Sequence, residues 1–235
     1  MCKNTGSHEQ LIAGRLHTFL VLALLGAWAY GGTRSMARFH GALHPQRVRL
    51  YLFSIGVEWL VFAVVVAGVV RARTPLSCVL GERWRSSREL LRDIAVAAAF
   101  WLAAMAGLIL FEWVLKIRGT GTTVLALLPR GAVESALWVA LAVSAGICEE
   151  TIFRGYLQRQ LIAMTGRPDT GLVLAAMIFG LGHLYQGWRM AIVIGVYGLM
   201  FGVLAYRRRS VRPGMIAHAW HDAFSGVLYS LLLRR

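Results

Sequence analysis

Charged residues are scarce in this chain, and acidic residues are the scarcest. Only 15% of the 235 residues are charged, with 11 Asp and Glu against 25 Lys and Arg. A soluble domain carries about 25% charged residues, whereas here 57% of the residues are hydrophobic and the mean hydropathy is +0.60. This composition excludes an ordinary soluble domain and indicates a protein whose main solvent is the lipid bilayer.

Familiar signatures of hydrolases and metal sites are also missing. The chain has no HExxH pair to fix a zinc site and no GxSxG turn to present a nucleophilic serine. Its three cysteines have no CxxC spacing, which excludes that type of zinc knuckle, and we interpret Cys148 as a small packing residue. A hydrolase built on this chain must therefore use another set of residues.

The formal net charge of +14 does not indicate a nucleic-acid partner. The basic residues lie at the ends of apolar runs rather than on one soluble face, as in loops held against anionic lipid. More of them fall on the side of the membrane that includes the N-terminus, which the positive-inside rule makes cytoplasmic. We predict an integral protein of the bacterial cytoplasmic membrane, with its N-terminus in the cytoplasm.

Long apolar runs set the fold class. A helix needs roughly 20 mostly apolar residues to span a bilayer. The sequence predicts an all-α fold, a polytopic transmembrane bundle of about seven helices, or eight if one run escapes detection. No repeat or soluble domain is evident, so we treat residues 1–235 as one membrane domain, with the catalytic core in 133–233. The predicted spans are 17–33, 50–70, 94–115, 133–157, 171–187, 189–206 and 213–233.

The first three spans contain isolated acids, which we interpret as structural. Glu112 is near enough to a helix end for its carboxylate to reach the interface. Glu58 lies closer to mid-span and is expected to face the bundle interior beside a local partner. The later spans differ from these because their polar residues come in groups.

Two adjacent acids and an arginine end the fourth predicted span. Glu149, Glu150 and Arg154 follow the almost wholly apolar stretch 136–147, where a charge costs roughly 2.5–3.5 kcal/mol on insertion scales. Glu150 and Arg154 are four residues apart on one helix face, so we expect a supporting ion pair. Glu149 points about 100° away and is free to act as a base. The alternative is a helix end at the interface, with both acids solvated.

The fifth span contains a histidine and the seventh a histidine with a carboxylate. His183 follows Phe179 by one turn, and His218 and Asp222 lie four residues apart on one face. Alone, either group is more often a hydrogen-bonded structural feature than a catalytic one. His221 shares part of the His218 face but lacks a carboxylate partner four residues away, so we rank it lower.

Ionisable groups on three helices are expected to converge on one interior cavity, because each is costly in lipid. The candidate catalytic residues are Glu149, His183, His218 and Asp222. Hydrolysis fits this set: Glu149 would deprotonate water and His183 would orient it or share a metal. His218 with Asp222 would stabilise the oxyanion or complete a metal shell. The same four residues are therefore the candidate metal ligands, although no motif demands zinc.

The three motifs together resemble the CAAX-protease and bacteriocin-processing family, also known from abortive-infection proteins, which includes the type II CAAX prenyl endopeptidases. EETIFR at 149–154 is similar to its EExxxR motif, FGLGH at 179–183 to its FxxxH motif, and HAWHD at 218–222 to its HxxxN/D motif. The resemblance covers about the last hundred residues. It implies a helical intramembrane protease that acts on a membrane-associated, lipidated peptide or protein.

The resemblance also implies roles for single residues. The first Glu of EExxxR and the His of FxxxH activate water, which points to Glu149 and His183. The third motif would stabilise the oxyanion, which points to His218 and Asp222. Zinc-dependent and metal-free glutamate mechanisms both stay open. Prenyl endopeptidases of the family commonly have Asn where this chain has Asp222, which favours a metal slightly and leaves prenyl-peptide specificity open.

Two other classes of function remain compatible with the sequence. One is a catalytically idle immunity or scaffold protein, which would bind a peptide or protein partner and tolerate loss of Glu149. The other is a proton-coupled transporter that uses the same acids and histidines as a relay. Matching halves with interrupted helices would favour a transporter, and the sequence has no such symmetry.

Overall fold

A computed structural model describes residues 10–40, 46–117 and 122–232 of the chain, and these contain helices and turns but no strand. The helical elements are α1 (Arg15–His40), α2 (Arg47–Arg71), α3 (Ser77–Leu80), α4 (Ser87–Val114), α5 (Thr122–Leu127), α6 (Ala132–Glu149), the π-helix η1 (Glu150–Leu157), α7 (Gln158–Thr165), α8 (Pro168–Gly182), the 3-10 turn η2 (Leu184–Gln186), α9 (Trp188–Arg208) and α10 (Arg212–Leu232). The predicted all-α membrane bundle is confirmed.

Each of the seven predicted spans coincides with a helical segment. Within the described residues, five segments are long and apolar enough to cross a membrane: α1, α2, α4, α9 and the continuous stretch from α6 through η1 to α7. Helix α8 is apolar but has only 15 residues, and α10 has polar residues in its first half. Helix count and type were therefore predictable from hydropathy, because the apolar runs are separated by charged or turn-forming residues.

Several predicted boundaries were wrong. The fourth span was expected to end at residue 157, but the helix continues to Thr165. The helix of the third span begins at Ser87, seven residues before the apolar run itself, because Ser86 caps it by accepting a hydrogen bond from the Glu89 backbone N–H, as the spacing of Ser86 and Glu89 predicts. The loop predicted for 116–132 contains the short helix α5, and its residues 118–121 lie outside the described part of the chain.

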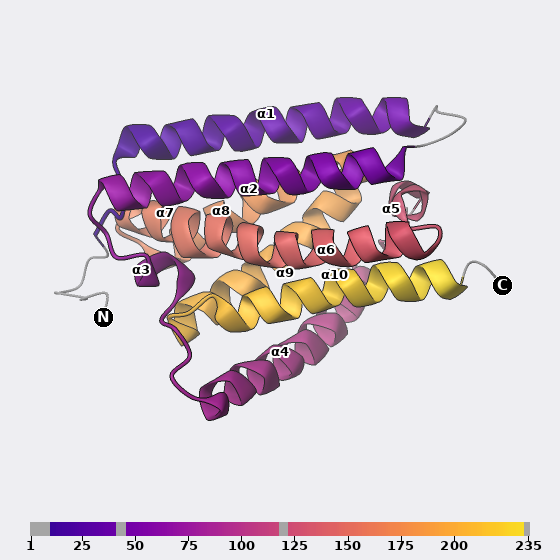
Figure 1. Ribbon diagram of the computed structural model, residues 1–235. Coiled ribbons are helices and arrows are strands. Elements are labelled where there is room, and N and C mark those ends of the chain that lie inside the picture. Colours follow the sequence, from indigo (N-terminus) through magenta and orange to yellow (C-terminus); the bar gives the residue numbers. More distant parts are fainter. Residues whose placement is uncertain (1–9, 41–45, 118–121, 233–235) are drawn as a thin grey trace.

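Helix α6 lies at the centre of the bundle, packed between α2 on one side and α10 on the other. Figure 1 shows α1, α2, α6 and α10 running roughly side by side, while α4 is inclined to them. Helices α8 and α9 pack closely on each other and meet η1. Because α6 ends at Glu149 and η1 begins at Glu150, the central place of α6 positions both acids of the first motif for contact with neighbouring helices.

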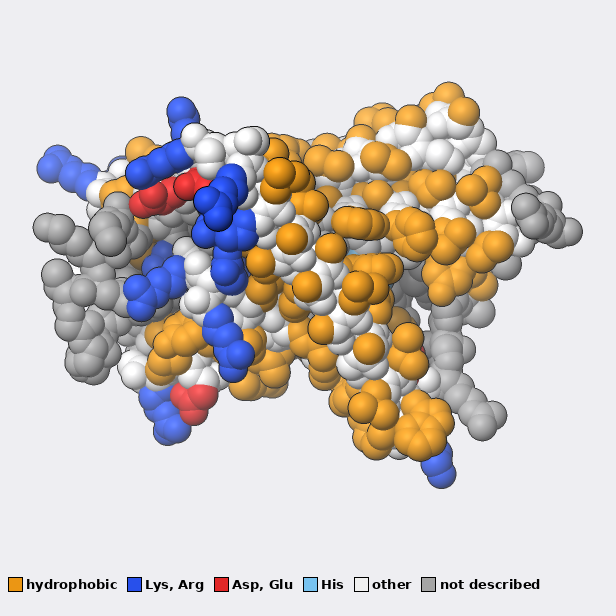
Figure 2. Space-filling view, turned by 90° about the horizontal axis from the view of Figure 1, so that it is seen from below, with side chains coloured by type: hydrophobic (Ala, Val, Ile, Leu, Met, Phe, Trp, Pro, Cys, Tyr) orange, Lys and Arg blue, Asp and Glu red, His pale blue; other side chains and the backbone are white. Residues whose placement is uncertain are grey.

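The surface divides into a basic end and an apolar body. In Figure 2 the Lys and Arg side chains gather at one end, and hydrophobic side chains cover most of the rest. Many large apolar side chains are exposed, including Leu16 at 86% and Trp113 at 75%. Such exposure is costly in water and ordinary in lipid, so it agrees with an integral membrane protein.

One buried acid contacts several side chains at the basic end of the bundle. Asp93 of α4 is 1% exposed and accepts a hydrogen bond from the Trp84 indole N–H at 2.9 Å. Arg212 and Arg208 lie 3.2 and 3.7 Å from its carboxylate oxygens. These contacts fix the start of α4 to the connection between α9 and α10, and so to the helix that carries the third motif.

Candidate functional site

A change of helix type falls between the two acids of the first motif. Helix α6 ends at Glu149, and the π-helix η1 covers Glu150–Leu157 before α-helical geometry resumes. Short π segments inside α-helices occur frequently at functional sites. All eight residues of η1 are buried. The α-helical geometry assumed from the sequence was therefore wrong for this segment.

The expected ion pair forms within η1. Arg154 lies 2.9 Å from the Glu150 carboxylate, and the two side chains are 2% and 0% exposed. Arg154 also donates to the Gly198 carbonyl oxygen at 3.1 Å, and its guanidinium lies 4.1 Å from the centre of the Phe179 ring. A charge-balanced and hydrogen-bonded arrangement of this kind is what a buried arginine requires.

His218 extends this pair into a chain of three groups. Its Nδ1 lies 3.1 Å from Glu150 Oε1, so the ring N–H donates to the carboxylate. Its Nε2 lies 3.7 Å from Glu149 and 3.5 Å from Asp222. Three surrounding carboxylates favour the imidazolium form, in which both ring nitrogens are donors. The sequence predicted the Asp222 contact but not the Glu150 contact, which joins separate helices.

Two glycines permit the close approach of α10 to α6 and η1. A Cβ atom at Gly146 would lie 2.7 Å from the Met215 carbonyl oxygen, and one at Gly214 would lie 2.9 Å from Glu150 Oε2. Both distances are shorter than real Cβ contacts, so a side chain at Gly146 would force the helices apart and one at Gly214 would displace the Glu150 carboxylate. These glycines therefore set the distance between His218 and the two glutamates.

Glu149 differs from Glu150 in its surroundings. Its side chain is 20% exposed, whereas that of Glu150 is fully buried. The Oε2 atoms of both glutamates are buried without a hydrogen-bond partner, but only that of Glu149 belongs to a partly exposed side chain, and His218 Nε2 lies near it. An acceptor left in this state is suited to a water molecule or a substrate group, as expected for a base.

His183 lies beside this cluster but makes no hydrogen bond to Glu149, His218 or Asp222. It is the residue that ends α8, and its Nδ1 lies 2.8 Å from the Phe179 carbonyl oxygen. Since a carbonyl oxygen only accepts, Nδ1 carries the proton and Nε2 keeps its lone pair in the neutral ring. The Phe179 ring lies 4.8 Å from the His183 ring and 6.2 Å from the His218 ring, so it neighbours both histidines.

His221 has a different environment from His218. Its Nδ1 accepts a hydrogen bond from the Trp101 indole N–H of α4 at 3.2 Å. In the neutral ring the proton is therefore on Nε2. The ring also lies 5.2 Å from Tyr197. This places His221 between α4 and α9, beside the cluster of Glu149, Glu150, His218 and Asp222 rather than within it.

Helix α2 brings one acid that we had interpreted as structural. Glu58 accepts a hydrogen bond of 2.6 Å from Ser144 of α6 and is close enough to Glu149, His218 and Asp222 to interact with them electrostatically. The predicted local partner is therefore present. The proximity to the other acids was missed because an isolated acid, one helix away from any motif, carries no signal in the sequence.

The donor atoms do not match a metal shell. Within the described residues, no three His, Cys, Asp or Glu side chains are grouped so that they could hold a metal ion. His218 is hydrogen-bonded to Glu150 through Nδ1, and His183 is hydrogen-bonded to the Phe179 carbonyl oxygen through Nδ1. The candidate zinc set drawn from the sequence does not fit this arrangement, so the chemistry below uses protein groups alone.

The fold and this cluster define a class: polytopic helical membrane proteins with linked acids, histidines and an arginine buried inside the bundle. Residues 131–224 match the family described as type II CAAX prenyl endopeptidase Rce1-like. The resemblance carried by the three motifs is thereby confirmed for this segment. No curated protein and no solved structure matches the chain.

Proposed function

We propose that the protein is an intramembrane endopeptidase that hydrolyses a peptide bond by glutamate-activated water. The observation that carries this proposal is the unpartnered Oε2 of Glu149, which lies beside His218. The Glu150–Arg154 ion pair holds the other side of the His218 ring through Glu150. The Rce1-like match over residues 131–224 agrees with a protease. The proposal is stated for the class of reaction, and the cleaved sequence is left open.

In the proposed reaction, Glu149 takes a proton from a water molecule, and the water oxygen attacks the carbonyl carbon of the peptide. Negative charge that develops on the carbonyl oxygen is stabilised by the cationic His218, whose ring is held by Glu150 and Asp222. Glu149 then passes its proton to the leaving amine as the C–N bond breaks. His183 offers the lone pair of Nε2 to orient the water.

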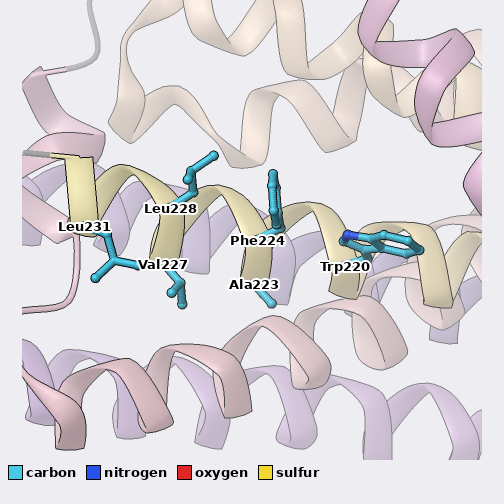
Figure 3. Close-up of a pocket in the computed structure, with 6 residues that line it drawn as sticks. All are labelled: Trp220, Ala223, Phe224, Val227, Leu228 and Leu231. Carbon is cyan, nitrogen blue, oxygen red and sulfur yellow. The ribbon is translucent and has the colours of Figure 1, made fainter.

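We propose that the substrate is a lipidated or otherwise membrane-associated protein. An open groove of about 540 Å³ lies along α10, lined by apolar side chains from its consecutive turns: Trp220, Ala223, Phe224, Val227, Leu228 and Leu231 (Figure 3). The groove begins two residues before Asp222, and Trp220 is stacked on Trp101 of α4 at 6.0 Å. An apolar chain lying in it would place an attached peptide near the acids.

We further propose that the basic end of the bundle faces the cytoplasm. The connections at that end contain Arg83, Arg85, Arg207, Arg208 and Arg209, and the positive-inside rule assigns such loops to the cytoplasmic side. Helix α1 begins at the same end, as Figure 1 shows. This supports the predicted cytoplasmic N-terminus, and protease protection of a tag at residue 1 in sealed vesicles would test it.

The first test compares purified wild type with Glu149→Gln on quenched-fluorescent peptides that include prenylated CAAX peptides. We expect the variant to lose at least about a thousandfold in kcat/KM, because it keeps the shape of the site but removes the base. Glu112→Gln is the matched control, since it makes the same change far from the cluster and should retain full activity. Full activity in Glu149→Gln would overturn the proposed glutamate mechanism, whereas no cleavage by wild type would favour a catalytically idle scaffold.

A strong chelator distinguishes the metal-free reaction from a zinc-dependent one. Because the donor atoms do not form a metal shell, we expect wild-type kcat to be the same with and without the chelator. Loss of activity that returns on addition of zinc would show that the side chains rearrange around a metal, contrary to the mechanism proposed here.

A further inference from the structure

One buried hydroxyl near the acids, that of Tyr197, has no hydrogen-bond partner. Tyr197 is on α9 and is 7% exposed, and its hydroxyl oxygen has no hydrogen-bond partner in the structure. Buried polar atoms are nearly always hydrogen-bonded, and each exception requires an explanation. A hydroxyl held in this state is suited to an occupant that is present only during the reaction.

The ring contacts of Tyr197 place this residue beside the site. Its ring packs on Phe201 at 4.7 Å and on His221 at 5.2 Å. Phe201 in turn lies 5.5 Å from the His218 ring. Tyr197 is also close enough to Asp222 and Glu150 to interact with them electrostatically. The phenol is therefore held by rigid aromatic contacts at the edge of the same cluster.

The proposed reaction needs a neutral donor that the three motifs do not supply. An ionised Asp222 accepts hydrogen bonds but cannot donate one, and an amide at that position would donate. His218 is a donor, but its two nitrogens already face Glu149, Glu150 and Asp222. A developing oxyanion in an acid-rich site therefore requires a further donor that carries no negative charge.

We propose that Tyr197 is a further catalytic residue, whose hydroxyl donates a hydrogen bond to the carbonyl oxygen of the scissile peptide as it becomes an oxyanion. The phenol keeps its proton throughout, so it stabilises charge and takes no part in proton transfer. This inference rests on the proposed endopeptidase function. It assigns to α9, a helix with none of the three motifs, the donor that Asp222 cannot be.

The test is Tyr197→Phe, which removes only the hydroxyl oxygen, assayed beside wild type and Glu149→Gln on a peptide that wild type cleaves. We expect kcat to fall roughly a hundredfold while KM changes by less than about twofold, because the hydrogen bond forms in the transition state. Tyr206→Phe is the matched control. It makes the same change on the same helix, at a 42% exposed position, and should keep wild-type kcat.

Thermal unfolding distinguishes a catalytic role of the Tyr197 hydroxyl from a structural one, because the two roles predict different changes in the melting temperature. A hydroxyl that stabilises the fold lowers the melting temperature when it is removed. A hydroxyl without a partner leaves the melting temperature unchanged or raises it. We expect unchanged or higher stability in Tyr197→Phe together with the loss of kcat. A lower melting temperature with unchanged kcat would overturn the inference.

Two further outcomes separate this inference from the proposed function. If Glu149→Gln is inactive and Tyr197→Phe has wild-type kcat, the inference falls and the proposed function stands. If Glu149→Gln is active, both fall. Tyr185→Phe tests a nearby phenol whose hydroxyl already accepts a hydrogen bond from Gln186 at 3.0 Å. A hundredfold loss there, with none in Tyr197→Phe, would assign the donor to Tyr185 and overturn the inference.

Discussion

The helices before residue 116 and those after residue 131 differ in how much of their surface is buried inside the protein. In the most apolar stretch of α1, α2 and α4, only 17%, 22% and 17% of the residues are buried inside the protein, whereas the figures are 50% for the α6–η1–α7 stretch and 39% for α9. The early helices present most of their surface to lipid. The later helices present theirs to one another and contain every residue of the three motifs.

This difference shows why the polar residues are tolerated where they are. A charged side chain that faces lipid has no partner, whereas one that faces other helices finds hydrogen bonds and counter-charges. Arg154 and Glu150 are buried almost completely and paired with each other. The early helices act mainly as a shell that excludes lipid from this interior. Glu58 is the exception, because it reaches across from α2.

The largest effect is expected from breaking the buried ion pair between Glu150 and Arg154. Arg154→Ala leaves Glu150 buried beside His218 without its counter-charge, and breaking a buried ion pair costs about 3–5 kcal/mol. We expect a large drop in the melting temperature and in the yield of folded protein. Arg167→Ala is the control, since its pair with Asp169 is exposed, and it should unfold as wild type does. Equal stability of the two variants would contradict the contrast between the interior and the surface.

A smaller effect tests whether the shell contributes to the reaction. Glu58→Gln keeps an acceptor for Ser144 but removes a carboxyl group that interacts electrostatically with Glu149, His218 and Asp222. We expect kcat to fall by about tenfold, because the electrostatic surroundings of these groups change, with little change in the melting temperature. The measurement is steady-state kinetics beside thermal unfolding. Wild-type kcat in this variant would make α2 a structural helix only.

The smallest effect is expected on the lipid-facing side of α1. Leu16 is 86% exposed, whereas Val21 on the same helix is fully buried. Leu16→Ala should leave stability within about 0.5 kcal/mol of wild type. Val21→Ala should cost about 1–2 kcal/mol, because packing contacts are lost. Unfolding in lipid–detergent mixtures measures both. A larger loss of stability for Leu16→Ala than for Val21→Ala would show that the Leu16 face of α1, and not the Val21 face, packs on the bundle.

Local spacing predicted part of this architecture and missed the rest for a physical reason. Hydropathy located all seven spans, and the four-residue spacing of Glu150 and Arg154 predicted their ion pair, because both signals act within one helix. The contacts from His218 to Glu150 and from Glu58 to Ser144 join different helices. Such contacts depend on how helices cross, which glycines such as Gly146 determine and which no spacing rule describes.

Residues with no unusual spacing were the hardest to recognise. Tyr197 is an aromatic residue in an apolar helix, and that pattern is typical of packing. Phe179 was noted only as part of a motif, although its ring contacts Arg154, His183 and His218. The roles of Glu149, His183, His218 and Asp222 in catalysis stay predictions until activity is measured.

The π-helical turn at Glu150–Leu157 makes the length of this segment matter more than the identity of most of its residues. A π turn holds one residue more than the α-helix it interrupts. Loss of one residue between Glu150 and Arg154 would let the segment close into a regular α-helix and would rotate Arg154 relative to both glutamates. In comparisons among related chains, a one-residue gap in this part of the alignment would mark a chain in which Arg154 no longer pairs with Glu150.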